Sequence, residues 1–298
     1  MKRLILTLCV STFFSFSNAN GQSAVRLTGL QSDHLENPIG IDNPAPRLSW
    51  KMEDSRQGAR QRAYRVLVGK DSIQVAGGTA DMWDTGKIIS ENILVTYAGK
   101  PLEPCTKYYW KVISDDLLDK EVASSVHSFE TGMMSIKNWQ GAWIGDGKDK
   151  DYQPAPYFRK KFAAGKTIKS ARAYIAAAGL YELYINGEKI GDHRLDPLYT
   201  RFDRRNLYVT YDVTGQLRNG DNAIGVLLGN GWYNHQSKAV WDFDRAPWRN
   251  RPAFCMDLRI TYSDGSVETI PTDLSWKTSS GGWFITAGAA FTICFVVT

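Results

Sequence analysis

Short runs of alternating apolar and polar residues, separated by turn-forming residues, occupy most of the chain. In residues 181–185 every second side chain is apolar, which is typical of a strand with one face on a core. Asn186-Gly187 follows, and because both residues tolerate a positive φ angle the pair predicts a type I′ hairpin turn. Residues 223–228 are apolar throughout and lie between Asn- and Gly-rich turns, which predicts a buried sandwich strand.

The same pattern recurs in both halves of the chain, and we find no long segment of helical periodicity. Trp50 follows a proline-rich approach to a strand and is a candidate core residue. A chain of this length suggests two domains of ordinary size. We therefore expect an all-β protein, with one sandwich over residues 25–132, a linker over residues 133–156 and a second sandwich over residues 157–280.

The linker combines aromatic and acidic residues. We expect Trp139, Trp143 and Ile144 to pack between the two sandwiches. Residues 145–151 (GDGKDKD) are polar and are expected to form an exposed loop. Their acidic side chains lack the ligand spacing and the terminal Glu of an EF-hand, so a solvated loop is favoured over a calcium site.

The two ends of the chain differ from the rest. Residues 1–19 resemble a secretory signal peptide, because Lys2 and Arg3 precede an apolar run that ends in small residues. We therefore expect export to the periplasm, the cell surface or the medium. Residues 281–298 carry no charge. We expect a truncated or frameshifted end there, with an apolar terminal strand and a membrane-associated tail as alternatives.

Charge and cysteine content exclude several classes of function. The formal net charge is +5 and falls to +3 (5 − 2) without Lys2 and Arg3, which is too small a bias to indicate a nucleic-acid partner. Without residues 1–19 the chain has Cys105, Cys255 and Cys294, which cannot all pair with one another. We expect the first two to be buried or isolated thiols.

Aromatic and polar side chains are concentrated in residues 230–251, directly after the predicted strand at residues 223–228. Sugar rings stack their apolar faces on aromatic side chains, and their hydroxyls need polar partners. An ordinary core would account for one or two of these aromatics, whereas four of them mixed with charges favour a surface. The candidate carbohydrate-binding residues are Trp232, Tyr233, Asn234, Trp241, Asp242, Arg245 and Trp248.

Several runs, in order, resemble the N-terminal part of bacterial α-L-rhamnosidases of the large inverting type. They are PRLSW, YYWKV, PYFRKKF, ARAYIAAAGLYELYINGEKIGDHRLDP, the YDVT turn and AIGVLLGNGWY, and they extend over residues 25–280. The resemblance implies a fibronectin type III-like sandwich followed by a galactose-binding-like jelly roll that helps to recognise substrate. It also implies that a large (α/α)6 barrel further along performs the hydrolysis.

Inverting hydrolysis needs a carboxylic acid and a carboxylate on opposite faces of the sugar. The resemblance places both in the barrel, so we expect no catalytic residue in this chain. A pair such as Asp242 and Asp244 is expected to be solvated. We therefore expect the chain to recognise a rhamnose-containing carbohydrate for a longer parent enzyme and to have no hydrolase activity alone.

Other functions remain open. The aromatic loop at residues 230–251 could instead pack against the barrel of the parent enzyme. A stand-alone carbohydrate-binding protein and a surface scaffold are two further alternatives. The resemblance allows a calcium ion but identifies no ligands for it, and we expect no other cofactor.

Overall fold

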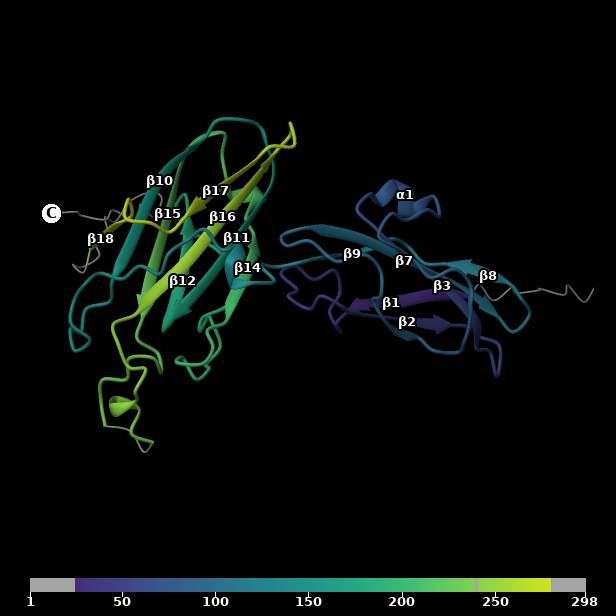
Figure 1. The fold of residues 1–298 in the computed structure, drawn as a ribbon, viewed down its shortest axis with the longest axis horizontal. Helices are drawn as coiled ribbons and strands as arrows, with labels where there is room; N and C mark the ends of the chain where they lie inside the picture. The colour runs from purple at the N-terminus through teal and green to yellow at the C-terminus, as the bar shows by residue number, and fades with distance from the viewer. Residues whose placement is uncertain (1–24, 239–240, 280–298) are drawn as a thin grey trace, which may run out of the picture.

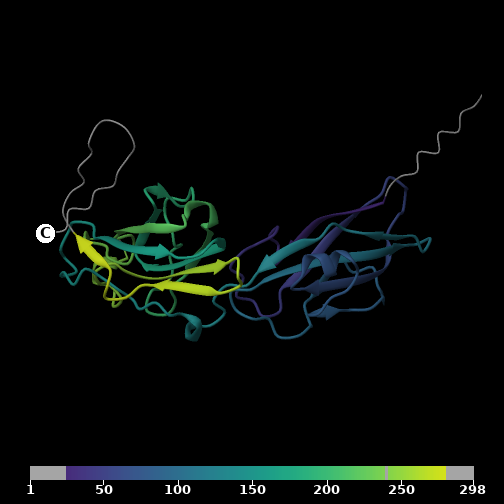
Figure 2. The same ribbon diagram turned by 90° about the horizontal axis from the view of Figure 1, so that it is seen from above.

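The computed structural model describes residues 25–238 and 241–279. Within these residues almost all regular structure is antiparallel β-sheet, arranged as two sandwiches placed end to end along the longest axis of the molecule (Figures 1 and 2). The all-β expectation is therefore confirmed. The segments predicted as a signal peptide and as an aberrant tail lie outside the described residues, as does Cys294.

The first sandwich, as described, packs a three-stranded sheet against a larger one. The smaller sheet has the order β1-β2-β6, with strands Arg26–Ser32, Arg47–Glu53 and Leu94–Thr96. The larger sheet is built around β3 and β7, and its strands are β3 Gln61–Gly69, β4 Trp83–Asp84, β5 Ile88–Ile89, β7 Lys107–Asp116, β8 Glu121–Ala123 and β9 His127–Glu130. Trp50 lies in the core between these sheets, as predicted.

Two local features stabilise the ends of this sandwich. The Tyr108 hydroxyl accepts a hydrogen bond from the Glu103 amide at 2.8 Å, which is the tyrosine corner of this type of sandwich. The short helix α1, Ser72–Ala76, begins at Asp71, whose carboxylate accepts bonds from the amides of Ile73 and Gln74.

The second sandwich, over its described residues, also has two sheets. The five-stranded sheet has the order β13-β12-β15-β10-β18, with strands Glu188–Lys189, Leu180–Ile185, Gly220–Gly229, Tyr157–Ala164 and Lys277–Ser279. The four-stranded sheet has the order β14-β11-β16-β17, with strands Tyr208–Asp212, Ile168–Ala178, Ala253–Tyr262 and Val267–Pro271. The 3-10 turns are η1 Ile136–Asn138, η2 Thr214–Gln216 and η3 Phe243–Arg245.

Strand β12 and its turn form as the sequence pattern predicts. Tyr181, Leu183 and Ile185 are buried and alternate with half-buried residues. Asn186 has a φ of 52° and Gly187 a φ of 91°, so both turn residues take positive values, as a type I′ turn requires. Strand β15 lies between β12 and β10 within the sheet, and its residues 223–228 are buried or half-buried, which accounts for their continuous apolar sequence.

The four-stranded sheet has an apolar inner face and an outer face that receives the first domain. Inner residues of β11 and β16, such as Ile175 and Met256, belong to the core of the sandwich. The alternate residues point outwards. On this outer face Tyr174 and Asp257 pair with one another and are nearly inaccessible, because the linker crosses the sheet above them.

Polar contacts fix the junction between the two domains. Arg172 on β11 makes two hydrogen bonds of 2.9 Å to the carboxylate of Glu130 on β9. Asp257 accepts bonds of 2.8 Å from the amides of Gln140 and Gly141 in the linker. These partners are far apart in sequence, and charge-assisted bonds of this kind hold a defined geometry.

A second polar group at the junction involves Tyr208. The Tyr208 hydroxyl donates to Asp42 at 2.6 Å and accepts from the Met133 amide at 2.9 Å. Gly132 lies so close to this hydroxyl that an added Cβ would come within 1.9 Å of it, so only glycine fits there. The first domain and the linker are thus held tightly against the outer face of the sheet.

The structure corrects three expectations about the linker. Trp143 is 47% exposed and does not pack between the sandwiches. Ile144 pairs with Phe254 and packs on the core of the second sandwich. Asp146 belongs to the segment expected to be solvated, yet its side chain is only 3% exposed because it is ion-paired with Arg251.

Cys105 and Cys255 are free thiols, as expected, and Cys255 is buried. Over the part of the chain that the structure describes, no helix has both the length and the apolar character needed to cross a membrane.

Candidate functional site

A cluster of aromatic rings covers one end of the second sandwich. It comes from the segment before β14 and from the loop that joins β15 to β16. Phe243 in η3 lies at the centre, and its ring centroid is 5.2 Å from that of Trp232, 6.0 Å from that of Trp241 and 6.2 Å from that of Trp248. The predicted loop residues are therefore brought together in space. We call this cluster the aromatic surface.

A cavity of about 480 Å³ lies beside Trp232. Its walls are mostly apolar and include Leu180, Leu198, Tyr199, Phe202 and His235. The His235 ring stacks on Trp232 with a centroid distance of 5.5 Å. Cavities of this size and apolar character, with a few polar groups, are typical of small-molecule sites.

Four of the predicted site residues lie at the surface. Trp241 is 75% exposed and Trp232 is 46% exposed, so both rings are open to a ligand. The carboxylate of Asp242 and the guanidinium of Arg245 form an exposed ion pair at 2.5 Å. The hydrogen bond that Arg245 donates to the Asp242 carboxylate raises the pKa of Arg245.

The other three predicted residues are turned inwards. Tyr233 is half-buried and packs edge-on against Phe202. Asn234 is fully buried, and its Nδ2 donates to the Lys150 carbonyl at 2.7 Å. Trp248 is half-buried, with its indole N–H inaccessible. These three side chains support the aromatic surface from below.

A buried ion pair braces the base of this loop. The Nε of Arg251 lies 3.0 Å and 3.2 Å from the two carboxylate oxygens of Asp146, and its Nη2 lies 2.7 Å from Oδ2. The same guanidinium donates to the carbonyls of Tyr152 at 2.6 Å and Pro154 at 2.5 Å. The linker is therefore the structural support of the aromatic surface, which the polar sequence of residues 145–151 did not reveal.

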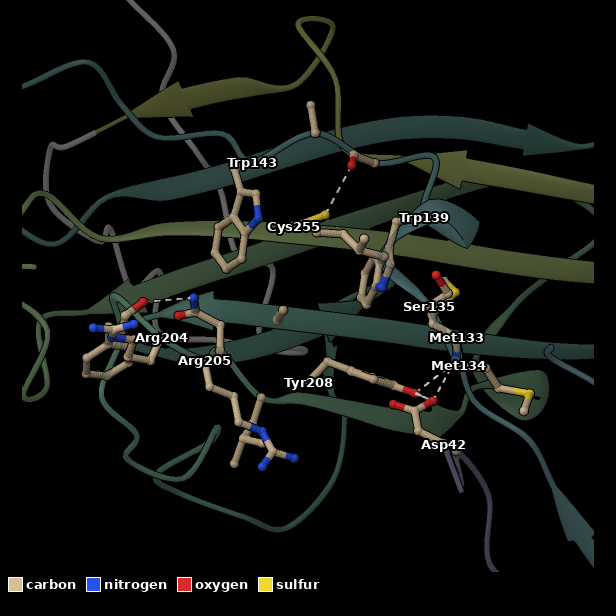
Figure 3. A pocket seen from close by; sticks show the side chains of 18 of the residues that line it. Asp42, Met133, Met134, Ser135, Trp139, Trp143, Arg204, Arg205, Tyr208 and Cys255 are labelled. Carbon is tan, nitrogen blue, oxygen red and sulfur yellow. Dashed lines mark hydrogen bonds between the residues drawn. The ribbon is translucent and has the colours of Figure 1, made fainter. Parts of the chain in front are cut away.

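A larger cleft, of about 790 Å³, lies on the other side of Phe202, at the domain junction. Figure 3 shows Trp139 and Trp143 on one wall and Arg204, Arg205 and Tyr208 on the other. The floor is the outer face of β11 and β16. The small side chains there, Ala176 and Cys255, leave space for the hollow. We call this hollow the junction cleft.

The charges of the junction cleft favour a polar ligand. Among the described residues, neither Arg204 nor Arg205 has a carboxylate within ion-pair distance, whereas Arg201 of the same loop is paired with Asp203. Burial raises the pKa of the Cys255 thiol to about 11, so this thiol stays protonated at neutral pH. Two exposed or half-exposed indoles opposite free guanidinium groups suit a saccharide.

Sequence reasoning missed the junction cleft. It expected Trp139 and Trp143 to be packing residues and gave Arg204 and Arg205 no role, because the two segments meet only through the tertiary fold. In residues 25–238 and 241–279 no three His, Cys, Asp or Glu side chains cluster as metal ligands would. We therefore assign no residue to the calcium ion that the resemblance allows.

The protein is thus a tandem of two β-sandwiches. Its two larger hollows lie beside the loops at one end of the second sandwich and at the junction of the two domains. Comparison with family models identifies each half. Residues 27–135 match the Rha78A-like, N-terminal immunoglobulin domain, and residues 166–289 match the alpha-L-rhamnosidase N-terminal domain. The immunoglobulin and fibronectin type III folds share the sandwich architecture predicted for the first half.

The chain is similar over most of its length to part of several longer proteins. A curated alpha-L-rhamnosidase of Formosa agariphila is 34% identical, and the match covers 94% of this chain and 32% of the relative. The solved structure of the alpha-L-rhamnosidase from Dictyoglumus thermophilum is 40% identical, with a TM-score of 0.79 over 86% of this chain and 30% of that one. The alpha-L-rhamnosidase structure from Aspergillus terreus is 32% identical, with a TM-score of 0.76 over 87% of this chain and 30% of that one.

The two halves of the chain are therefore domains of the kind found at the N-terminus of α-L-rhamnosidases, and the chain corresponds to the N-terminal part of these longer proteins. It spans about a third of the length of the curated relatives that it matches.

Proposed function

We propose that this chain is the substrate-recognition part of an α-L-rhamnosidase whose whole form removes terminal α-L-rhamnose from glycosides or polysaccharides. The similarity of both domains to those of α-L-rhamnosidases supports the class of reaction. The observation that carries recognition is the pair of exposed indoles, Trp232 and Trp241, beside a cavity of about 480 Å³.

The recognition face extends beyond the aromatic surface. Phe202 lines both the apolar cavity and the junction cleft, so one loop separates two neighbouring hollows. A glycan that spans both would place sugar faces on Trp232 or Trp241 and on Trp143, and would direct polar groups to Arg204 or Arg205. Asp242 and Arg245 supply further hydrogen-bonding groups at the rim. Asn234, Tyr233 and Trp248 act as supports in this proposal, not as contacts.

The test is a titration of the full chain with L-rhamnose and with a rhamnose-terminated oligosaccharide, followed by intrinsic Trp fluorescence and calorimetry. Trp241→Ala and Trp143→Ala are expected to weaken oligosaccharide binding by about tenfold each, as the loss of a stacking contact would. Leu118→Ala is the control, because Leu118 is as exposed as Trp241 (75%) but lies in the first domain. Unchanged affinity in both Trp variants would contradict the proposal.

A second use of the aromatic surface is docking against the next domain of the parent enzyme. The exposed leucines beside Trp232 favour this use, since Leu195 is 67% and Leu198 is 72% exposed and neither can hydrogen-bond a sugar. If docking is the only use, sugars leave the Trp fluorescence unchanged. The isolated chain is then expected to self-associate through this patch, and Leu198→Asp to restore a monomer.

We further propose that the chain is exported through residues 1–19 and that hydrolysis requires the rest of the parent enzyme. N-terminal sequencing of the protein recovered outside the cytoplasm tests the first statement, with a new N-terminus near residue 20 expected. Incubation of the purified chain with an aryl rhamnoside tests the second, and turnover above the buffer blank would contradict it.

A further inference from the structure

A groove of about 370 Å³ lies on the same outer sheet face as the junction cleft, on the opposite side of the linker crossing. Strands β11 and β16 supply Ser170, Arg172, Arg259 and Thr261, and the first domain supplies Lys70, Lys107 and Tyr109 across the junction. Lys169 of β11 also lines the groove. Five of the side chains that line this basic groove are cationic, and they are Lys70, Lys107, Lys169, Arg172 and Arg259.

Two of the cations face one another in an unfavourable arrangement. Arg172 and Arg259 are direct partners on neighbouring antiparallel strands. Like charges in this position destabilise a sheet. Arg172 is compensated by Glu130 at 2.9 Å and by Asp212 at 2.9 Å. Arg259 has no carboxylate within ion-pair distance in the described part of the chain, so its charge is left without compensation.

The remaining charges do not restore the balance. Lys70 is paired with Glu103 at 2.6 Å. Lys107 and Lys169 have no carboxylate within ion-pair distance among residues 25–238 and 241–279. Glu130 is the acidic residue that lines the groove, and both of its oxygens are already bonded to Arg172. A partly enclosed hollow with one sign of charge concentrates the electrostatic field and attracts the opposite charge.

A buried hydroxyl below the groove provides a second, independent observation. Tyr174 is 0% exposed and lines the groove, and its hydroxyl lies beside the Cys105 thiol with no oxygen or nitrogen partner in the described residues. Sulfur is a weak hydrogen-bond acceptor, so a ligand oxygen would satisfy this buried hydroxyl better than the thiol does. Burial, together with the neighbouring Cys105 thiol, raises the pKa of Tyr174, so this hydroxyl keeps its proton and remains a donor.

We propose that the basic groove binds an anionic group, a carboxylate or a sulfate, of an acidic saccharide. Arg259 is the principal charged donor, Lys107 and Lys169 flank it from the two domains, and the Tyr174 hydroxyl lies beneath. The saccharide part of this proposal rests on the proposed function in glycan recognition. The anion part rests on the charges of the groove and on the buried Tyr174 hydroxyl, and does not depend on that function.

Calorimetric titration of the full chain tests the proposal with trigalacturonate, its neutral methyl ester and a sulfated trisaccharide. At least one acidic sugar is expected to bind about tenfold or more tightly than the ester, and to raise the midpoint of thermal unfolding. Which of the two acids binds more tightly identifies the anionic group. Equal binding of the ester and both acids would overturn the proposal, as would an inorganic sulfate ion that binds as tightly as the acidic sugars.

Variants locate the binding. Arg259→Met is expected to weaken acidic-sugar binding about tenfold, while the free protein becomes no less stable, because a like-charge pair has been removed. Lys161→Met, at an exposed lysine of β10 in the other sheet, is the matched control and is expected to leave binding unchanged. An Arg259→Met protein that binds normally, or an equal loss in the Lys161→Met protein, would overturn the assignment.

The two proposals fail separately. If neutral rhamnose oligosaccharides bind and acidic sugars do not, only the proposal of an anion site in the basic groove is contradicted. If acidic sugars bind at Arg259 and rhamnose oligosaccharides cause no response, only the proposal that the aromatic surface and the junction cleft recognise rhamnose is contradicted.

Discussion

Removal of Asp146 is expected to destabilise the second sandwich strongly, although its sequence context is that of a surface loop. The side chains of Asp146 and Arg251 are 3% and 5% exposed, so Asp146→Ala leaves a buried guanidinium without its counter-ion. Loss of one partner of a buried pair typically costs about 3–5 kcal/mol. Arg251 keeps its bonds to the carbonyls of Tyr152 and Pro154, which places the expected loss near 3 kcal/mol.

Urea unfolding at 25 °C, followed by circular dichroism, measures this loss. With a slope of about 2 kcal/mol per molar urea, the midpoint of the affected transition should fall by roughly 1.5 M. Asp151→Ala is the control, because Asp151 forms an ion pair with Arg249 from the same loop but is itself 67% exposed, while the side chain of Arg249 is 10% exposed. The carboxylate of Asp151 is largely solvated and Arg249 keeps its hydrogen bond to the His235 carbonyl, so the pair should contribute no more than about 1 kcal/mol and the control midpoint should move by less than about 0.5 M.

Equal shifts in the Asp146→Ala and Asp151→Ala proteins would refute this reasoning, since burial would then make no difference. The double variant Asp146→Leu/Arg251→Met gives a further check. It removes both charges, so it is expected to recover part of the lost stability, which a purely steric effect of the Asp146 substitution would not allow.

Three smaller predictions concern other parts of the fold. Tyr108→Phe leaves the Glu103 amide without its acceptor and should cost about 1 kcal/mol in denaturant unfolding; an unchanged midpoint would show that the tyrosine corner contributes nothing. Cys255 should resist iodoacetamide at pH 8 until urea is added, because burial raises its pKa to about 11; rapid labelling of the native protein would contradict this. The hydrogen bond from Lys160 is the largest cause that lowers the pKa of Asp273 to about 2 from 3.8. The lower folded-state pKa stabilises the protein above pH 3.8, and this contribution is lost as the pH falls through 2, so wild type and Asp273→Asn should converge in stability over that range.

Much of the fold could be predicted because half-buried strands leave a periodic signal in the sequence. The alternation of residues 181–185 and the Asn186-Gly187 turn are local features, and each determined its own structure. Strand β15 was recognisable because its residues 223–228 are buried or half-buried and are therefore apolar.

The site was harder to predict because its contacts join distant segments. Asp146 and Arg251 lie 105 positions apart, and neither carries a local sign of its partner. The junction cleft forms where the linker crosses the outer face of the second sandwich, so its two walls come from residues that are unrelated in the sequence. The composition of residues 230–251 did reveal the aromatic surface. It could not separate the exposed Trp241 from the buried Asn234, because this distinction depends on contacts with Lys150.

The most direct test of glycan recognition is a two-dimensional ¹H–¹⁵N spectrum of the indole N–H groups, recorded while a rhamnose-terminated oligosaccharide is added to the full chain. Shifts are expected for Trp232 and Trp241 on the aromatic surface and for Trp143 in the junction cleft. The core residues Trp50 and Trp110 are nearly inaccessible and should not respond. Saturable shifts confined to the exposed indoles would support recognition of the sugar by these surfaces. A spectrum in which none of these indole signals moves at any sugar concentration would contradict it.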